Sequence, residues 1–132
     1  MYYLQIVINL LIALIISFVI GEERSNSGKA IGFRSIALVM IGAFAFTIAS
    51  CNIDNNVIDY HVIAQIVTGI SFVGAGLIFK DNSVHNLTTA ISVWTCAAIG
   101  ILLGLNRILE ALLIAAVVFC ILSYKKKKNY EN

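Results

Sequence analysis

Five long apolar runs follow one another along this sequence, and short polar segments separate them. They cover residues 2–20, 35–51, 61–79, 87–105 and a last stretch that ends at Tyr124. A helix that crosses a bilayer needs roughly 20 mostly apolar residues. Helices suit hydrocarbon because they satisfy their own backbone groups, and no proline interrupts these runs. The pattern predicts an all-α fold, a polytopic membrane helical bundle with about five transmembrane helices.

The balance of residue types excludes an ordinary water-facing domain. The chain is 60% hydrophobic and only 12% charged, whereas a soluble domain is about a quarter charged. We therefore expect residues 1–124 to form one transmembrane domain and residues 125–132 to form a basic cytoplasmic tail. The fourth and fifth runs could instead form a re-entrant hairpin, although their lengths favour two full spans. The first run lacks the features of a cleaved signal peptide, so we expect it to be retained.

The basic residues predict the orientation of the chain. With five spans, eight of the nine basic residues fall on one side: Arg24, Lys29, Arg34, Lys80 and residues 125–128. Basic residues accumulate on the cytoplasmic side, so the N-terminus is expected outside and the C-terminus in the cytoplasm. The lysine run next to the last span is expected to contact anionic lipid headgroups rather than nucleic acid.

Small residues occur at spacings that favour close helix packing. Helices in lipid associate where small side chains let their backbones approach. The glycines expected to serve this purpose are Gly28, Gly32, Gly69, Gly74, Gly76, Gly100 and Gly104. The glycine-rich third run has two interpretations, a plain packing groove or a kinked helix beside a cavity.

A few polar side chains fall at the ends of the runs or inside them. The candidate polar site consists of Glu23, Arg24, Arg34, Gln65, Thr88 and Thr89. Polar groups in hydrocarbon need partners, so these should face inward. We expect Glu23 to pair with Arg24 or Arg34, and Gln65, Thr88 and Thr89 to line a small pocket. Such a pocket suits a hydrated Mg²⁺ ion, which keeps several waters. The alternative is an ion pair and hydrogen bonds that only stabilise the fold.

Three motif blocks occur in order along the chain. They are Gly21-Glu-Glu-Arg24 with Gly28-Lys29 and Gly32-Phe-Arg34, then Ala64-Gln65 through Gly74-Ala-Gly76, then Leu87-Thr88-Thr89 through Gly100. Together they resemble the N-terminal transmembrane domain of the MgtC/SapB family over about residues 5–122. Each block alone is weak, but all of them in sequence are specific.

The resemblance implies a bacterial inner-membrane protein of five helices without an established catalytic activity. Members are linked to growth in low magnesium, to virulence through survival inside host cells, and in some cases to inhibition of the rotary ATP synthase. Many carry a soluble domain after the fifth helix, and we do not expect one in this chain. The chain departs from the family pattern at His61 and at His85-Asn86, where arginines are usual. A group that titrates near neutral pH cannot replace a permanent charge, so a function of those arginines is in doubt here.

Three functions remain open at this point. The first is a regulatory protein that contacts a membrane partner such as ATP synthase through its helices. The second is a small ion or solute transporter, for example a homodimer. The third is a structural subunit. No hydrolase, nucleotide-binding or zinc motif occurs, so we expect neither an enzyme nor a resident cofactor.

Overall fold

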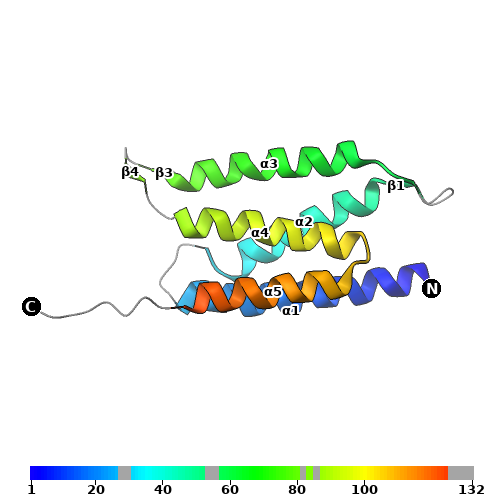
Figure 1. Ribbon diagram of the computed structural model, residues 1–132, viewed down its shortest axis with the longest axis horizontal. Coiled ribbons are helices and arrows are strands. Elements are labelled where there is room, and N and C mark those ends of the chain that lie inside the picture. Colours follow the sequence, from blue (N-terminus) through cyan, green and yellow to red (C-terminus); the bar gives the residue numbers. More distant parts are fainter. Residues whose placement is uncertain (27–30, 53–56, 81–82, 85–86, 125–132) are drawn as a thin grey trace, which may run out of the picture.

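The computed structural model describes residues 1–26, 31–52, 57–80, 83–84 and 87–124. Its helices are α1 (Tyr2–Asn26), α2 (Phe33–Ala49), α3 (Tyr60–Ile78), α4 (Leu87–Gly104) and α5 (Ile108–Ser123) (Figure 1). Two short antiparallel hairpins join helices, β1 (Cys51–Asn52) with β2 (Val57–Ile58) and β3 (Phe79–Lys80) with β4 (Ser83–Val84). The predictions for Gly28, Lys29, His85, Asn86 and the tail 125–132 lie outside the described residues.

The predicted all-α bundle of five helices is confirmed for the described part of the chain. Helices α1, α3 and α4 are long and apolar enough to cross a membrane. Helices α2 and α5 are apolar but shorter, with 17 and 16 residues. At about 1.5 Å per residue such helices are a little shorter than a hydrocarbon core of roughly 30 Å.

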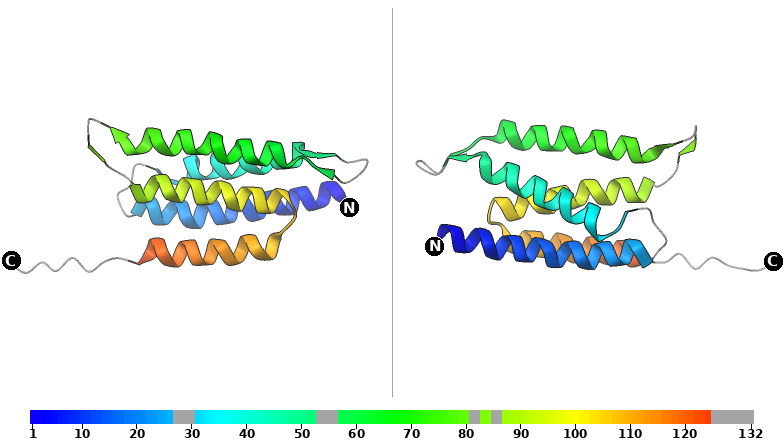
Figure 2. Two further views of the ribbon diagram at one scale, coloured as in Figure 1. Left: turned by 45° about the horizontal axis from the view of Figure 1, so that its top comes forward. Right: turned by 180° about the vertical axis from the view of Figure 1, so that it is seen from behind.

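Helix α4 is the centre of the bundle. It packs against each of the other four helices, and nine of its eighteen residues are buried. In Figures 1 and 2, α3 forms one outer edge of the molecule, while α1 and α5 lie together on the other side. The fully buried side chains of Met40, Val93, Cys96, Ile99 and Leu103 fill the space between α2 and α4 and their neighbours.

Two glycines of α4 let α2 approach unusually closely. A Cβ at Gly100 would lie 2.3 Å from the carbonyl oxygen of Met40. A Cβ at Gly104 would lie 2.6 Å from the Cβ of Thr47. Neither distance is tolerated between real atoms, so the contact between α2 and α4 requires glycine at both positions. This is the close packing of backbones that drives helix association in lipid.

The turn between α4 and α5 is a Schellman motif. The N–H of Arg107 donates to Leu102 O at 2.9 Å, and the N–H of Asn106 donates to Leu103 O at 3.0 Å. Asn106 has a φ of 59°, the left-handed conformation in which asparagine is tolerated better than most residues. These two bonds satisfy carbonyls that the end of α4 would otherwise leave unpaired.

Helix α3 begins with a side-chain cap. The Oδ1 of Asp59 accepts a hydrogen bond of 2.9 Å from the backbone N–H of His61, which satisfies one of the unpaired donors at a helix start. Replacing Asp59 with Ala should therefore destabilise the protein by about 1 kcal/mol. Asp59→Asn keeps the acceptor and is the matched control. The free energies of unfolding in mixed detergent micelles measure the effect, and equal losses in both variants would contradict the capping role.

Candidate functional site

A buried ion pair lies at the end of the bundle where α1 finishes. Arg24 is in the last turn of α1 and is only 4% exposed, while the adjacent Glu23 side chain is 10% exposed. The Nε of Arg24 donates to Oε2 of Glu23 at 2.6 Å, and Nη2 lies at the same distance. A two-point contact of this kind suits the planar guanidinium. The pair allows two charges to be buried because each offsets the other.

The same guanidinium also caps the C-terminal end of α5. Its Nη2 donates to the carbonyl oxygen of Leu122 at 3.2 Å, and Leu122 lies in the last turn of that helix. The last carbonyls of a helix have no partner within it and carry its partial negative charge. A buried cation is therefore stabilised here by a carboxylate and by the negative end of a helix.

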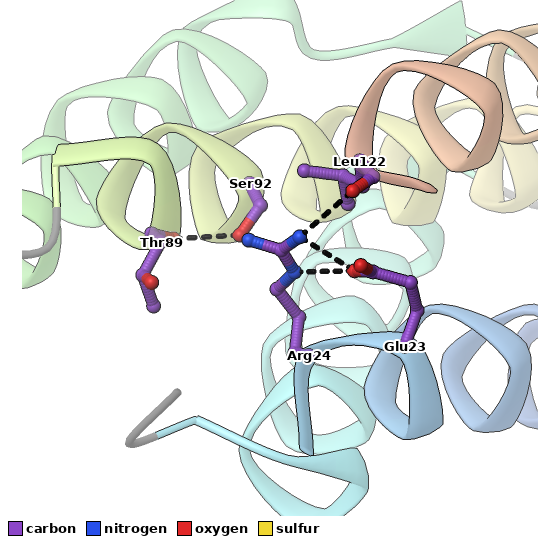
Figure 3. Close-up of polar contacts among 5 residues, drawn as sticks. All are labelled: Glu23, Arg24, Thr89, Ser92 and Leu122. Atoms are coloured by element: carbon purple, nitrogen blue, oxygen red, sulfur yellow. Dashed lines mark hydrogen bonds and ion pairs between the residues drawn. The ribbon is translucent and has the colours of Figure 1, made fainter. Parts of the chain in front are cut away.

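Helix α4 supplies the third side of this site (Figure 3). The hydroxyl of Ser92 donates to the carbonyl oxygen of Thr89, three residues earlier in the same helix, at 2.7 Å. Thr89 is 1% exposed, and its Oγ1 has no hydrogen-bond partner within the described residues. We call Glu23, Arg24, Thr89, Ser92 and the Leu122 carbonyl the Arg24 cluster.

The Arg24 cluster takes its residues from three helices, and the hydrogen bond from Arg24 to Leu122 O joins two of them, α1 and α5. Glu23 and Arg24 come from α1, Thr89 and Ser92 from α4, and Leu122 from α5. Among the described residues, no group of three or more His, Cys, Asp or Glu side chains is placed to hold a metal ion. The one carboxylate in the cluster is paired with Arg24, so its geometry resembles a structural clamp more than a site for a bare ion.

The structure separates the other predicted polar residues from this cluster. Arg34 and Thr88 are exposed in the first turns of α2 and α4. Gln65 is near the start of α3, thirteen residues from Ile78, and α3 runs antiparallel to α4. At about 1.5 Å per residue, that places Gln65 roughly 20 Å along the bundle from the start of α4. The expected pocket of Gln65 with Thr88 and Thr89 is not formed.

Gln65 instead lines an apolar groove between α2 and α3. The groove has a volume of about 570 Å³, and His61, Phe46 and Gly69 also line it. His61 and Gln65 are exposed in the first turns of α3. The side chains of this groove are mainly those of branched apolar residues on the two helices.

The predicted packing glycines differ in their surroundings. Gly100 and Gly104 contact α2, as described above, and Gly74 is buried at van der Waals distance from Ala90 of α4. A Cβ at Gly32 would meet only Ser25, at 3.9 Å. A Cβ at Gly69 or Gly76 would meet no described atom within 4 Å. A packing role for these last two glycines would need a partner outside the described fold.

Sequence reasoning missed two buried polar residues of α1, Asn9 and Ser17. Asn9 is 3% exposed, and Ser17 is fully buried with its hydroxyl donating to Ala13 O at 2.7 Å. A pattern in the sequence could have identified them. Asn9, Ala13, Ser17 and Gly21 recur every four residues and end near Arg24, so they share one helix face. That face is the buried one.

Comparison with known proteins places the chain in a family. The model of the MgtC family matches residues 10–130. Protein MgtC of Salmonella typhimurium (strain LT2) is 36% identical over 115 residues, which are 86% of this chain and 49% of that protein. Protein MgtC of Brucella abortus (strain 2308) is 39% identical over 110 residues, 83% of this chain and 45% of that protein. The chain thus spans about half the length of the curated relatives it matches.

No solved structure matches the chain significantly. The family match covers nearly all of the helices described above. Together with the three helices that are long and apolar enough to cross a membrane, it shows that this is a membrane protein and that the chain belongs to the MgtC family.

Proposed function

We propose that this chain is a regulatory protein of the bacterial inner membrane, linked to magnesium homeostasis, that acts by docking helix α3 against a helix of a membrane partner. Family membership supports the link to magnesium. The proposed topology is multi-pass, with the N-terminus outside and the C-terminus in the cytoplasm, because basic residues favour the cytoplasmic side. The proposal includes no catalytic activity.

The exposure of α3 is the observation that carries the proposal. Only Gly74 is buried among its nineteen residues, although the helix is long and apolar enough to span a membrane. A Cβ at Gly76 or at Gly69, which lines the groove between α2 and α3, would meet no described atom within 4 Å. Exposed Thr68 and Ser71 donate only to carbonyls of their own helix, Ala64 O and Val67 O. Small and hydroxyl side chains are typical of surfaces where another membrane helix packs.

The interior of the bundle favours regulation over transport by a single chain. Apolar, fully buried side chains occupy the middle of the helices, among them Ile20, Met40, Cys96 and Ile99. Ions cross membranes along paths lined by polar side chains or filled with water. The described core gives such an ion little to bind between the Arg24 cluster and the other end of the bundle.

The docking face can be tested by its effect on growth. In a strain that lacks the gene, Gly69→Leu should abolish rescue of growth in low magnesium, because the added side chain blocks approach of the partner backbone. Ala116→Leu is the matched control, since Ala116 is exposed on α5. Both variants should accumulate in the membrane at the wild-type level. Full rescue by Gly69→Leu would contradict docking through this face.

Two further measurements separate the partner and the activity. Cysteine crosslinking from Gly69 in native membranes should capture a membrane subunit, with ATP synthase and a second copy of the chain as the two candidates. The purified chain in proteoliposomes should produce no Mg²⁺ flux above that of empty vesicles. A protein-dependent flux would show transport and overturn the regulatory proposal.

A further inference from the structure

The groove between α2 and α3 adjoins a second cavity at the β1–β2 hairpin. The hairpin joins the two helices at one end, and α2 runs obliquely away from α3 beyond it (Figures 1 and 2). This second space, which we call the hairpin cavity, has a volume of about 770 Å³. His61 lines both spaces, so the groove and the hairpin cavity meet at the start of α3.

The two spaces differ in polarity. Among the described residues that line the groove, only His61 and Gln65 are polar, and both lie toward the hairpin end of α3. The hairpin cavity adds the polar side chains of Ser50, Asp59 and Tyr60. A ligand that fills both spaces therefore needs a long apolar part and a polar end. A membrane lipid has this form, with an acyl chain for the groove and a headgroup for the hairpin cavity.

The length of the groove matches one leaflet of a bilayer. Its lining on α3 extends from His61 to Val73, which is roughly 18 Å of helix at about 1.5 Å per residue. Half of a hydrocarbon core of about 30 Å is about 15 Å. In the proposed topology the hairpin faces outward, so the groove runs from the outer headgroup level to about the middle of the membrane. This is the path of one acyl chain of an outer-leaflet lipid.

The groove is too narrow for a helix of another protein. A volume of about 570 Å³ spread over roughly 18 Å gives a mean cross-section of about 30 Å². A helix with its side chains is about 10 Å across, which corresponds to roughly 80 Å². A glycine on each wall leaves the space open, because a Cβ at Gly42 of α2 or at Gly69 of α3 would meet no described atom within 4 Å. An extended hydrocarbon chain fits between these two backbones.

The polar groups at the hairpin end indicate the headgroup. The N–H of Asp59 donates to Ser50 O at 3.0 Å, and Oδ1 of Asp59 accepts from the N–H of His61 at 2.9 Å. These bonds hold an exposed carboxylate on the hairpin cavity, where an ammonium group would make a charge-assisted hydrogen bond. The imidazole of His61 and the amide of Gln65 can donate to phosphate oxygens. A headgroup with both a phosphate and a primary ammonium satisfies all three side chains.

We propose that the groove and the hairpin cavity bind one molecule of phosphatidylethanolamine. One acyl chain lies between α2 and α3, the phosphate lies beside His61 and Gln65, and the ammonium lies beside Asp59. The bound acyl chain holds the headgroup near its partners, so that individually weak polar contacts form at a high effective concentration. Phosphatidylcholine fits less well because its ammonium has no N–H to donate. Phosphatidylglycerol has no ammonium and would bring its negative charge toward a carboxylate.

This inference goes beyond the proposed function and does not rest on it. Thr68 and Ser71, which belong to the proposed docking face of α3, do not line the groove. A lipid in the groove therefore leaves their side of α3 open to a partner. Gly69 belongs to the docking face and also lines the groove, so the variants used to test the lipid leave Gly69 unchanged.

Native mass spectrometry of the full protein, purified from bacterial membranes in mild detergent, tests the occupancy. The wild type should keep one phospholipid per protein, and extraction should identify it as phosphatidylethanolamine. Gly42→Leu places a side chain in the groove and should lower the affinity for the lipid about tenfold. Gly76→Leu is the matched control and should keep the lipid, because a Cβ there also meets no described atom within 4 Å but Gly76 does not line the groove.

Titration of the delipidated protein with lipids that share the same acyl chains tests the headgroup. The wild type should bind phosphatidylethanolamine about tenfold more tightly than phosphatidylcholine, because only the former donates to a carboxylate. Asp59→Asn keeps the acceptor that caps α3 but removes the charge. It should reduce this preference to about twofold or less without changing the affinity for phosphatidylcholine. Equal affinity of the wild type for the two lipids would overturn the proposal.

A photoreactive lipid locates the acyl chain without any substitution. Phosphatidylethanolamine with a diazirine at the end of one acyl chain should label the protein near Leu38 and Val73, where the groove ends. Labelling at Val117, which is exposed on α5, should be several-fold weaker. This pattern decides the question even where Gly42→Leu alters folding. Equal labelling of Val117 would show bulk lipid only and would overturn the proposal, as would a lipid retained by a stably folded Gly42→Leu variant.

Discussion

Arg24→Gln is expected to destabilise the bundle by about 3–5 kcal/mol, the usual cost of removing one partner from a buried ion pair. The Glu23 side chain, 10% exposed, would lose the guanidinium that now lies 2.6 Å away. The end of α5 would also lose the donor to Leu122 O. Free energies of unfolding in mixed micelles of increasing SDS fraction measure the change. Arg24→Lys keeps the charge but not the planar fork, so it should recover only part of the loss.

Two further variants identify the source of that effect. The double variant Glu23→Gln with Arg24→Gln should be more stable than Arg24→Gln alone, because the carboxylate that Arg24 offsets is then removed as well. Arg34→Gln removes an exposed arginine from α2, and it should change the stability by less than about 0.5 kcal/mol. If Arg24→Gln were no more harmful than Arg34→Gln, the Arg24 cluster would contribute nothing to the fold.

The sequence predicts the helices of this protein well, with one informative exception. The predicted bounds of α2, α3 and α4 lie within two residues of those observed, and the predicted end of α5 lies one residue away. Helix α1 continues to Asn26, six residues beyond the apolar run, and includes Glu23 and Arg24. A hydropathy criterion places the end of a span at the first charged residue. It cannot detect that a charged pair stays inside the bundle by capping another helix.

The candidate site could be predicted only in part, because membership of a site depends on where helix ends meet. Glu23 and Arg24 form an ion pair, whereas Gln65 lies toward the other end of α3 from the start of α4. Asn9 contacts Asn106 across 97 positions, and neither residue stands out in a sequence read one run at a time. The four-residue recurrence along α1 indicates the buried face, but it does not say which helix covers that face.

Glycine spacing likewise predicts a surface for packing without identifying the helix that packs there. The pairs Gly100 with Gly104 and Gly69 with Gly76 both suggest close packing by their sequence, yet only the first pair has a neighbour within the described fold. Spacing identifies a surface that permits close approach. Whether α2, a second copy or a partner occupies that surface depends on the arrangement of all five helices.

Gly100→Ala should destabilise the protein by about 1–3 kcal/mol, the range for an added methyl group in a packed core. The new Cβ would lie 2.3 Å from Met40 O and 3.1 Å from the Cβ of Ala43. The nearest atom belongs to the backbone of α2, so no side chain can rotate to relieve the clash and the helices must separate. Alanine favours a helix over glycine by up to about 1 kcal/mol, which offsets part of this cost but not all of it.

Gly69→Ala and Gly76→Ala are the matched controls for this prediction. They make the same chemical change on α3, where a Cβ meets no described atom within 4 Å, so the purified chain should keep its stability or gain slightly. Gly100→Ala combined with Gly104→Ala should cost more than either change alone, because both widen one contact between α2 and α4. Unfolding free energies in mixed micelles rank the four single variants and the double variant. Equal stability of Gly100→Ala and Gly76→Ala would mean that α4 does not pack on α2 through Gly100, and the arrangement of helices around the central α4 would have to be revised.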